Sequence, residues 1–195
     1  MPARHFAPDG GVPAPIREGV DRLREALDVP VSFPADVLAE ADRAATSPRV
    51  PDLDLTGVEF VTIDPEGSMD LDQALHLERS GRGYVVRYAI ADVAAWVPPG
   101  GAIDAEARRR GQTLYAPDRR AALHPPRLSE SSASLLADGT PRPAQVWTIR
   151  LDAEGRQTEA RVERAMVRSR AKLTYPGVQA DLDAGRAPES LLLLR

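Results

Sequence analysis

Three aspartates lie close together in the segment "TIDPEGSMDLDQAL", residues 62–75. Asp70 and Asp72 are separated by one residue, so an extended chain places both carboxylates on one side, with Cα atoms roughly 6–7 Å apart. Asp64 ends the preceding apolar stretch, and the five residues after it include a proline and a glycine, which can turn the chain back. Carboxylate oxygens of this kind suit Mg²⁺ or Mn²⁺, and such an ion supports phosphodiester hydrolysis.

A structural interpretation of the same residues is an acidic turn. Asp64 precedes a proline, as turn openers often do, and Asp70 and Asp72 can accept hydrogen bonds from nearby backbone amides. Asp-rich turns are common, so the motif alone favours the turn. The spacing also does not match the calcium-binding EF-hand pattern.

Hydrophobic periodicity predicts the elements that must position these aspartates. Strands are expected at 58–63, 74–79, 84–93, 145–151 and 157–170, and helices at 15–27, 34–45, 104–110 and 175–183. The apolar continuity of 84–93 predicts a place near the sheet centre. Because strands follow one another through hairpins, we expect an α+β fold with a mixed, largely antiparallel sheet and flanking helices. Residues 1–50 are expected to form a helical N-terminal extension and linker, and residues 51–195 the compact domain.

Composition narrows the class of protein. The 195 residues carry a net charge of −4, which argues against a protein that coats nucleic acid non-specifically. The arginine runs 108–110 and 119–120 are nevertheless candidate basic patches. There is no cysteine, no apolar run of bilayer length and no secretory signal at the start, so we expect a cytoplasmic protein without a membrane partner.

Four blocks together resemble a known family. "TIDPEGSMDLDQAL", "YAIADVAAWVPPGGAIDAEARRRGQTLYAPD", "HPPRLSESSASLL" and "RSRAKLTYPGVQ" are similar, in this order, to the first half of the RNB catalytic domain. That domain belongs to the RNase II and RNase R family of 3′-to-5′ exoribonucleases. The resemblance covers about residues 55–180 and implies a partial RNB-type fold.

The resemblance assigns roles to individual residues. It places Asp64, Asp70 and Asp72 on the first three of four aspartates that bind Mg²⁺, with Asp70 and Asp72 as catalytic residues and Asp72 the most critical. The fourth position is Gln73, whose amide oxygen can reach a metal but brings no charge. Tyr115 falls on a tyrosine that stacks on nucleotides near the 3′ end; its structural alternative is a half-buried strand tyrosine.

The function implied by the resemblance is hydrolysis of single-stranded RNA from its 3′ end to 5′-mononucleotides, with Mg²⁺, or Mn²⁺ in its place. The expected partner is single-stranded RNA, and the chain is expected to be a monomer. The later half of the domain is missing, and the final "SLLLLR" has nothing after it to pack against, so we expect a truncated chain. The alternative is a catalytically silent RNA-binding or interaction module, which Gln73 and the missing half both favour.

Overall fold

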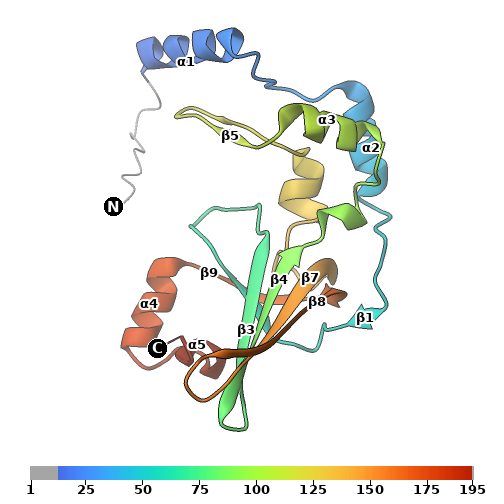
Figure 1. The fold of residues 1–195 in the computed structure, drawn as a ribbon. Coiled ribbons are helices and arrows are strands. Elements are labelled where there is room, and N and C mark those ends of the chain that lie inside the picture. The colour runs from blue at the N-terminus through green and yellow to red at the C-terminus, as the bar shows by residue number, and fades with distance from the viewer. Residues whose placement is uncertain (1–12, 195) are drawn as a thin grey trace. The chain divides into compact units, whose positions relative to one another are not determined.

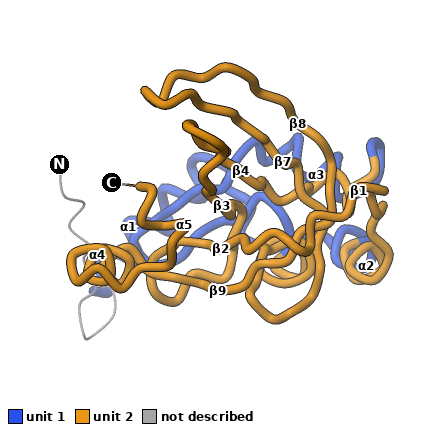
Figure 2. The backbone as a smooth tube through the Cα atoms, turned by 90° about the horizontal axis from the view of Figure 1, so that it is seen from below, with its two compact units in different colours: residues 1–40, 99–125 blue, residues 41–98, 126–195 orange. Residues whose placement is uncertain are grey.

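The computed structural model describes residues 13–194, which divide into two compact units (Figure 2). Unit 1 contains the described residues up to Glu40 together with Pro99–Pro125, and unit 2 contains Ala41–Pro98 and the described residues from Pro126 onward. The domain boundary near residue 50 stays a prediction. Over the described range, none of the helices is long and apolar enough to cross a membrane.

Unit 2 is built on a seven-stranded sheet (Figure 1). In spatial order its strands are β1 (Leu53–Asp54), β8 (Gln157–Val167), β7 (Arg142–Leu151), β4 (Gly83–Ala91), β3 (Gln73–Ser80), β2 (Phe60–Ile63) and β9 (Ser169–Leu173). Only the outer pairs β1–β8 and β2–β9 are parallel within this sheet. The expected α+β fold with a mixed, largely antiparallel sheet is therefore confirmed, and β4 lies at its centre as its apolar sequence predicts.

The two faces of the sheet carry separate apolar clusters. One face packs small and branched side chains together: Phe60, Ala74, Ala89, Leu135, Ala144, Val146, Ala165 and Val167. Helices α4 (Tyr175–Asp183) and α5 (Glu189–Leu192) supply Val178 and Leu191 to the second cluster, which includes Leu75 of β3. Two short helical turns, η1 (Val93–Ala95) and η2 (Leu128–Ser132), complete unit 2.

One expectation about the C-terminal part is wrong. The predicted strand 157–170 breaks at Arg168, because β7 begins at Arg142 and offers β8 no partner beyond Val167. The chain then crosses to the opposite edge of the sheet, where it forms strand β9 and pairs with β2. The segment "SLLLLR" packs against earlier elements of the chain, where Leu191 is 1% exposed against β2, β3 and β9.

Unit 1 contains helices α1 (Ala14–Ala26) and α3 (Ala102–Arg110) and a hairpin of β5 (Leu114–Tyr115) and β6 (Arg120–Ala121). Helix α2 (Ala35–Ala44) runs from unit 1 into unit 2. Helix α3 ends at Gly111, whose φ of +76° lies in the left-handed region that favours glycine. The predicted helices at 15–27, 34–45 and 104–110 are confirmed within two residues at each end.

Candidate functional site

The acidic loop, residues 64–72, connects β2 to β3 in unit 2. Its first residue is fixed to the sheet edge, since the Asp64 N–H donates to the Leu173 carbonyl at 3.0 Å. A turn follows in which the Ser68 N–H donates to the Pro65 carbonyl at 3.2 Å and Gly67 has φ of +83°. Both ends of the loop therefore continue the sheet, and the turn folds the chain back as its proline and glycine predict.

Ser134 holds the far part of the acidic loop. Its hydroxyl accepts a hydrogen bond from the Leu71 N–H at 2.9 Å and donates one to the Met69 carbonyl at 2.7 Å. The neighbouring Leu135 N–H donates to the Leu71 carbonyl at 2.7 Å, and the Leu71 side chain is fully buried. Sequence reasoning missed this role, although Ser134 lies inside the resemblance block "HPPRLSESSASLL".

The three aspartates share one electrostatic environment. Burial raises the pKa of the Asp64 carboxyl, and the negative charges of Asp72 and Asp70 raise it further, while Lys172 opposes them. Across residues 13–194, no three His, Cys, Asp or Glu side chains are arranged as a ready-made set of metal ligands. The donor chemistry of the three carboxylates fits a hard divalent cation, because a cation relieves the repulsion among them.

Gln73 and Tyr88 extend the site onto the sheet. Gln73 is the exposed first residue of β3, and strand alternation places it on the same face as Leu75, the Cα partner of Tyr88. Burial raises the pKa of the Tyr88 phenol, and the nearby charges of Asp72 and Asp64 contribute. Tyr88 therefore stands within electrostatic reach of the aspartates, a role that its position inside an apolar strand did not signal.

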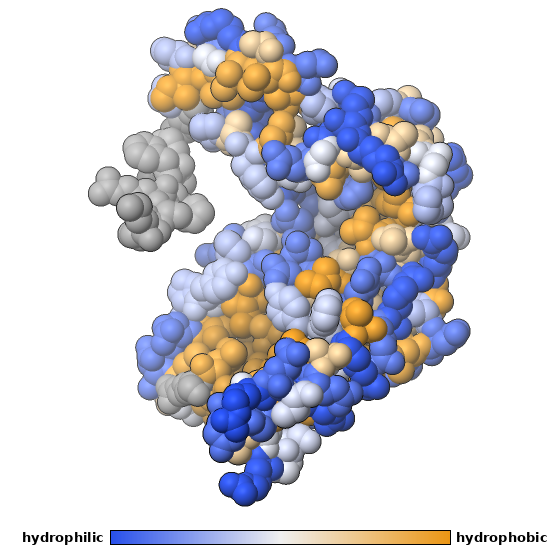
Figure 3. Space-filling model, viewed as in Figure 1, coloured by the Kyte–Doolittle hydropathy of each residue, from blue (hydrophilic) through white to orange (hydrophobic). Residues whose placement is uncertain are grey.

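Tyr115 lies in strand β5 of unit 1. Its side chain is 75% exposed, so the half-buried strand tyrosine of the structural alternative is not what the structure contains. Beside it an apolar pocket is lined in part by Val20 and Leu23 of α1 and by Leu27, which directly follows this helix. Figure 3 shows the apolar surface of this helix. An exposed ring next to an apolar surface is suited to stacking on a base.

An ion pair anchors the connection that follows Tyr115. Arg24 of α1 is buried and donates to Asp118 through both terminal nitrogens, at 2.8 Å from Nη1 to Oδ2. Arg24 Nη1 also donates to Asp21 at 2.9 Å, and its Nη2 to the Arg119 carbonyl at 3.2 Å. Helix α1 and the loop between β5 and β6 are thus joined by bidentate, charge-assisted hydrogen bonds.

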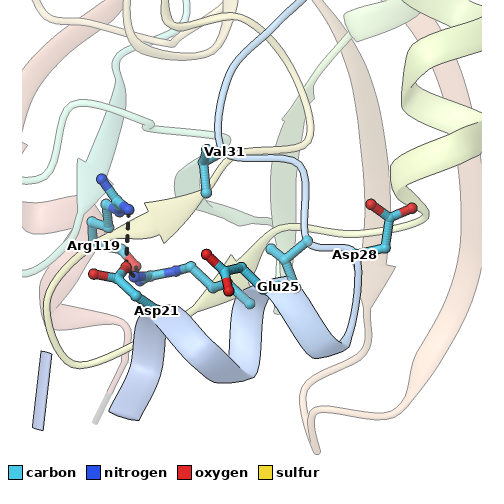
Figure 4. A pocket seen from close by; sticks show the side chains of 7 residues that line it. Asp21, Glu25, Asp28, Val31 and Arg119 are labelled. Atoms are coloured by element: carbon cyan, nitrogen blue, oxygen red, sulfur yellow. Dashed lines mark hydrogen bonds and ion pairs between the residues drawn. The ribbon is translucent and has the colours of Figure 1, made fainter. Parts of the chain in front are cut away.

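A polar pocket lies beside this ion pair (Figure 4). Its lining includes the carboxylates of Asp21, Glu25 and Asp28, and Arg119 contacts Asp21 at 3.2 Å. Because acidic side chains line it, the pocket is unsuited to a phosphate backbone.

The arginine run 108–110 is occupied by internal contacts. Arg110 is buried and bonds to Glu106 at 2.8 Å and to the carbonyls of Pro30 and Ala122 at 3.0 and 2.9 Å. Arg109 bonds to the same glutamate, and Arg108 to Asp104. The expectation of a basic patch at these positions is therefore wrong for Arg110, whose guanidinium serves the packing of unit 1.

Comparisons with known proteins match this architecture. Residues 53–191 match the family model described as the RNB domain. Exoribonuclease 2 of Pasteurella multocida is 40% identical over 136 residues, 67% of this chain and 20% of the relative. Ribonuclease R of Acidithiobacillus ferrooxidans is 33% identical over 184 residues, 91% of this chain and 39% of the relative.

A solved structure gives the same fold. It is Mycoplasma genitalium RNase R in complex with ribose methylated single-stranded RNA, with a TM-score of 0.78 and 25% identity over 88% of this chain and 27% of that chain. The sheet with its acidic loop and the matched family model define one class: the chain belongs to the RNB domain family. It spans about a fifth of the length of the Pasteurella relative.

Removing the Ser134 hydroxyl is expected to loosen the acidic loop. Ser134→Ala leaves the buried Leu71 N–H without its acceptor, which costs about 1–3 kcal/mol in the free energy of unfolding. Urea denaturation measures the loss, and hydrogen exchange of residues 64–72 locates it. Ser132→Ala is the control, because the Ser132 hydroxyl makes no hydrogen bond to any residue that the structure describes. Equal stability of the Ser134→Ala variant and the wild type would show that the loop does not depend on this hydroxyl.

The Arg24–Asp118 pair makes the stability of unit 1 depend on pH. Arg24 lowers the pKa of the Asp118 carboxyl to about 2, so the pair stabilises the fold above the usual carboxyl pKa of 3.8 and that contribution is lost as pH falls toward 2. Asp118→Asn is expected to lower the Tm at pH 7 and to match the wild type near pH 2.

Thermal melts between pH 7 and pH 2 measure this convergence. Glu25→Gln is the matched control on α1, since Glu25 makes no side-chain ion pair with any residue in the described range. A Tm difference that did not change with pH would contradict the assignment to the carboxylate.

Proposed function

We propose that this chain carries part of the catalytic domain of a 3′-to-5′ exoribonuclease, which hydrolyses single-stranded RNA to 5′-mononucleotides. The observation that supports it most is the electrostatic effect of Asp72 and Asp70 on Asp64 within one loop of an RNB-type sheet. The proteins named above as Exoribonuclease 2 and Ribonuclease R, and the RNase R solved with single-stranded RNA, support the same reaction class.

Asp64, Asp70 and Asp72 would hold Mg²⁺, or Mn²⁺, with the Gln73 amide oxygen as a neutral fourth donor. A bound divalent ion would supply charge stabilisation at the phosphodiester and a water of lowered pKa. Within the chain itself, the sheet edge and Ser134 fix the backbone of the loop that carries the three carboxylates. Gln73 brings no charge, so the site binds its ion with one negative charge fewer than four aspartates would give.

Tyr115 would act as a stacking platform for the RNA. Its ring is exposed, and its loop is fixed by the Arg24–Asp118 pair, so little conformational freedom is lost when a base stacks on it. A monomeric state and a cytoplasmic location stay predictions from the sequence.

A catalytically silent RNA-binding module is the second candidate. It is favoured by Gln73 and by the absence of a ready-made set of metal ligands among residues 13–194. This alternative predicts salt-dependent RNA binding without any loss of labelled oligonucleotide when Mg²⁺ is added.

Asp72→Asn tests the proposed reaction. In the longest natural form of the protein, the variant is expected to lose hydrolysis of single-stranded RNA by at least about 100-fold, since one negative charge at the ion is removed. RNA affinity is expected to stay close to that of the wild type. A 5′-labelled oligonucleotide that shortens stepwise, with a 3′ label released at once as mononucleotide, measures both rate and direction.

Asp52→Asn is the matched control for this experiment, because Asp52 is an exposed aspartate of unit 2 outside the acidic loop. Full turnover by the Asp72→Asn variant would exclude the proposed mechanism. Binding without turnover by the wild type would favour the silent module.

Tyr115→Ala is expected to weaken RNA binding. Stacking of a base on an aromatic side chain contributes about 1–3 kcal/mol, so the Kd for a short single-stranded oligonucleotide should rise roughly 5- to 150-fold. Fluorescence anisotropy measures the change, and Tyr115→Phe, which keeps the ring, should bind as the wild type does. If both variants bound RNA normally, Tyr115 would not be a stacking platform.

A further inference from the structure

Lys172 is the only lysine in a chain that otherwise uses arginine for its basic side chains. It lies in β9, in register with Thr62 of β2, two residues before the first aspartate of the acidic loop. Parallel pairing places the side chains of register partners on one face of the sheet. Lys172 is therefore aligned with the loop by the backbone of the sheet.

The Lys172 ammonium reaches the middle of the acidic loop. Its Nζ donates a hydrogen bond to the carbonyl of Ser68, which lies between Asp64 and Asp70 in the sequence. This contact holds the turn from the side of β9, whereas Ser134 holds Met69 and Leu71 from the side of η2. The loop is thus tied to two different segments of unit 2.

The positive charge of the Lys172 ammonium also opposes the negative charges of the nearby carboxylates. Its positive charge lowers the pKa of Asp64, against the increase caused by burial and by Asp72 and Asp70. A compact ammonium can approach a carbonyl and a carboxylate together without the planar geometry that a guanidinium requires. A lysine therefore suits this position better than the arginine found elsewhere in the chain.

We propose that Lys172 is a positioning residue of the acidic loop, which holds the Ser68 carbonyl and keeps Asp64, Asp70 and Asp72 together before any divalent ion binds. This role extends the proposed function. It rests on that proposal in one respect, because it requires the three aspartates to hold the ion. Lys172 acts through the loop and is not itself a ligand.

Two effects of Lys172 on ion binding have opposite signs. As a nearby positive charge it repels a divalent cation, so its removal would tighten binding. As the tether of the loop it orders the ligands in advance, so its removal would weaken binding. The positioning role predicts that the second effect is the larger.

The affinity for Mn²⁺ decides between these effects. We expect Lys172→Met to weaken Mn²⁺ binding about tenfold, as the loss of one hydrogen bond from a charged group would. Lys172→Arg, which keeps the positive charge and a donor, should bind Mn²⁺ more tightly than Lys172→Met. Electron paramagnetic resonance of free Mn²⁺ measures the affinities, and equal or tighter binding by Lys172→Met would overturn the proposal.

Arg170→Met is the matched control variant. Arg170 lies in the same strand and also donates to a backbone carbonyl, that of Thr56 at 2.9 Å, which is outside the acidic loop. Its loss removes a cation and a side-chain-to-backbone hydrogen bond from β9 without releasing the loop. A tenfold weakening of Mn²⁺ binding in this variant as well would overturn a specific role of Lys172.

Hydrogen exchange in the presence of a chelator tests the tether without any metal. Lys172→Met is expected to speed exchange of the amides of residues 66–72, whereas Arg170→Met leaves them as in the wild type. If the wild type binds no Mn²⁺ but Lys172→Met loosens the loop, the proposed function fails and the tether stands. If Mn²⁺ binds and Lys172→Met leaves exchange unchanged, the tether fails and the proposed function stands.

Discussion

Repulsion among three carboxylates on one short loop is the constraint that the contacts around this loop must oppose. Asp64, Asp70 and Asp72 raise one another's electrostatic free energy, so the loop cannot hold them together by its own conformational preferences. The opposing contacts come from outside the loop: the sheet edge at Leu173, the Ser134 hydroxyl and the Lys172 ammonium. Each is a hydrogen bond to the backbone of the loop and not to its carboxylates.

In unit 1, unlike in the acidic loop, charges of opposite sign lie next to each other. Its arginines mostly bond to carboxylates and carbonyls of the same unit, as Arg24 does with Asp118 and Arg110 with Glu106. Those charges are neutralised internally and contribute little to a basic surface for RNA. An exposed aromatic ring, Tyr115, is the feature of this unit best suited to a nucleotide. The stacking role proposed for Tyr115 is compatible with the negative net charge of the chain.

The sequence predicted the elements well where local patterns decide them, and less well where distant segments meet. The apolar run of β4 indicated its central place, and the left-handed Gly111 ended α3 where expected. The break between β8 and β9 was missed, because it depends on where β7 ceases to offer partners.

The candidate site shows the same division. The aspartates could be proposed from their spacing and Gln73 from the resemblance, and their roles stay predictions, whereas the sequence did not connect Ser134, Lys172 and Tyr88 with the loop. Their side chains are ordinary in their own segments, and only the tertiary fold brings them to the loop.

The crossing of the chain from β8 to β9 has a consequence for the order of folding. The hydrogen bonds that hold the acidic loop join residues 63, 65 and 104 positions apart in the sequence. Contacts of such high sequence separation form late, because the entropy of closing the intervening chain must be overcome first. The β3–β4 hairpin can form from its own residues, but the loop beside it is held on both sides only once Ser134 and β9 are in place. We therefore expect the acidic loop to reach its final conformation late in folding, after β9 has joined the sheet.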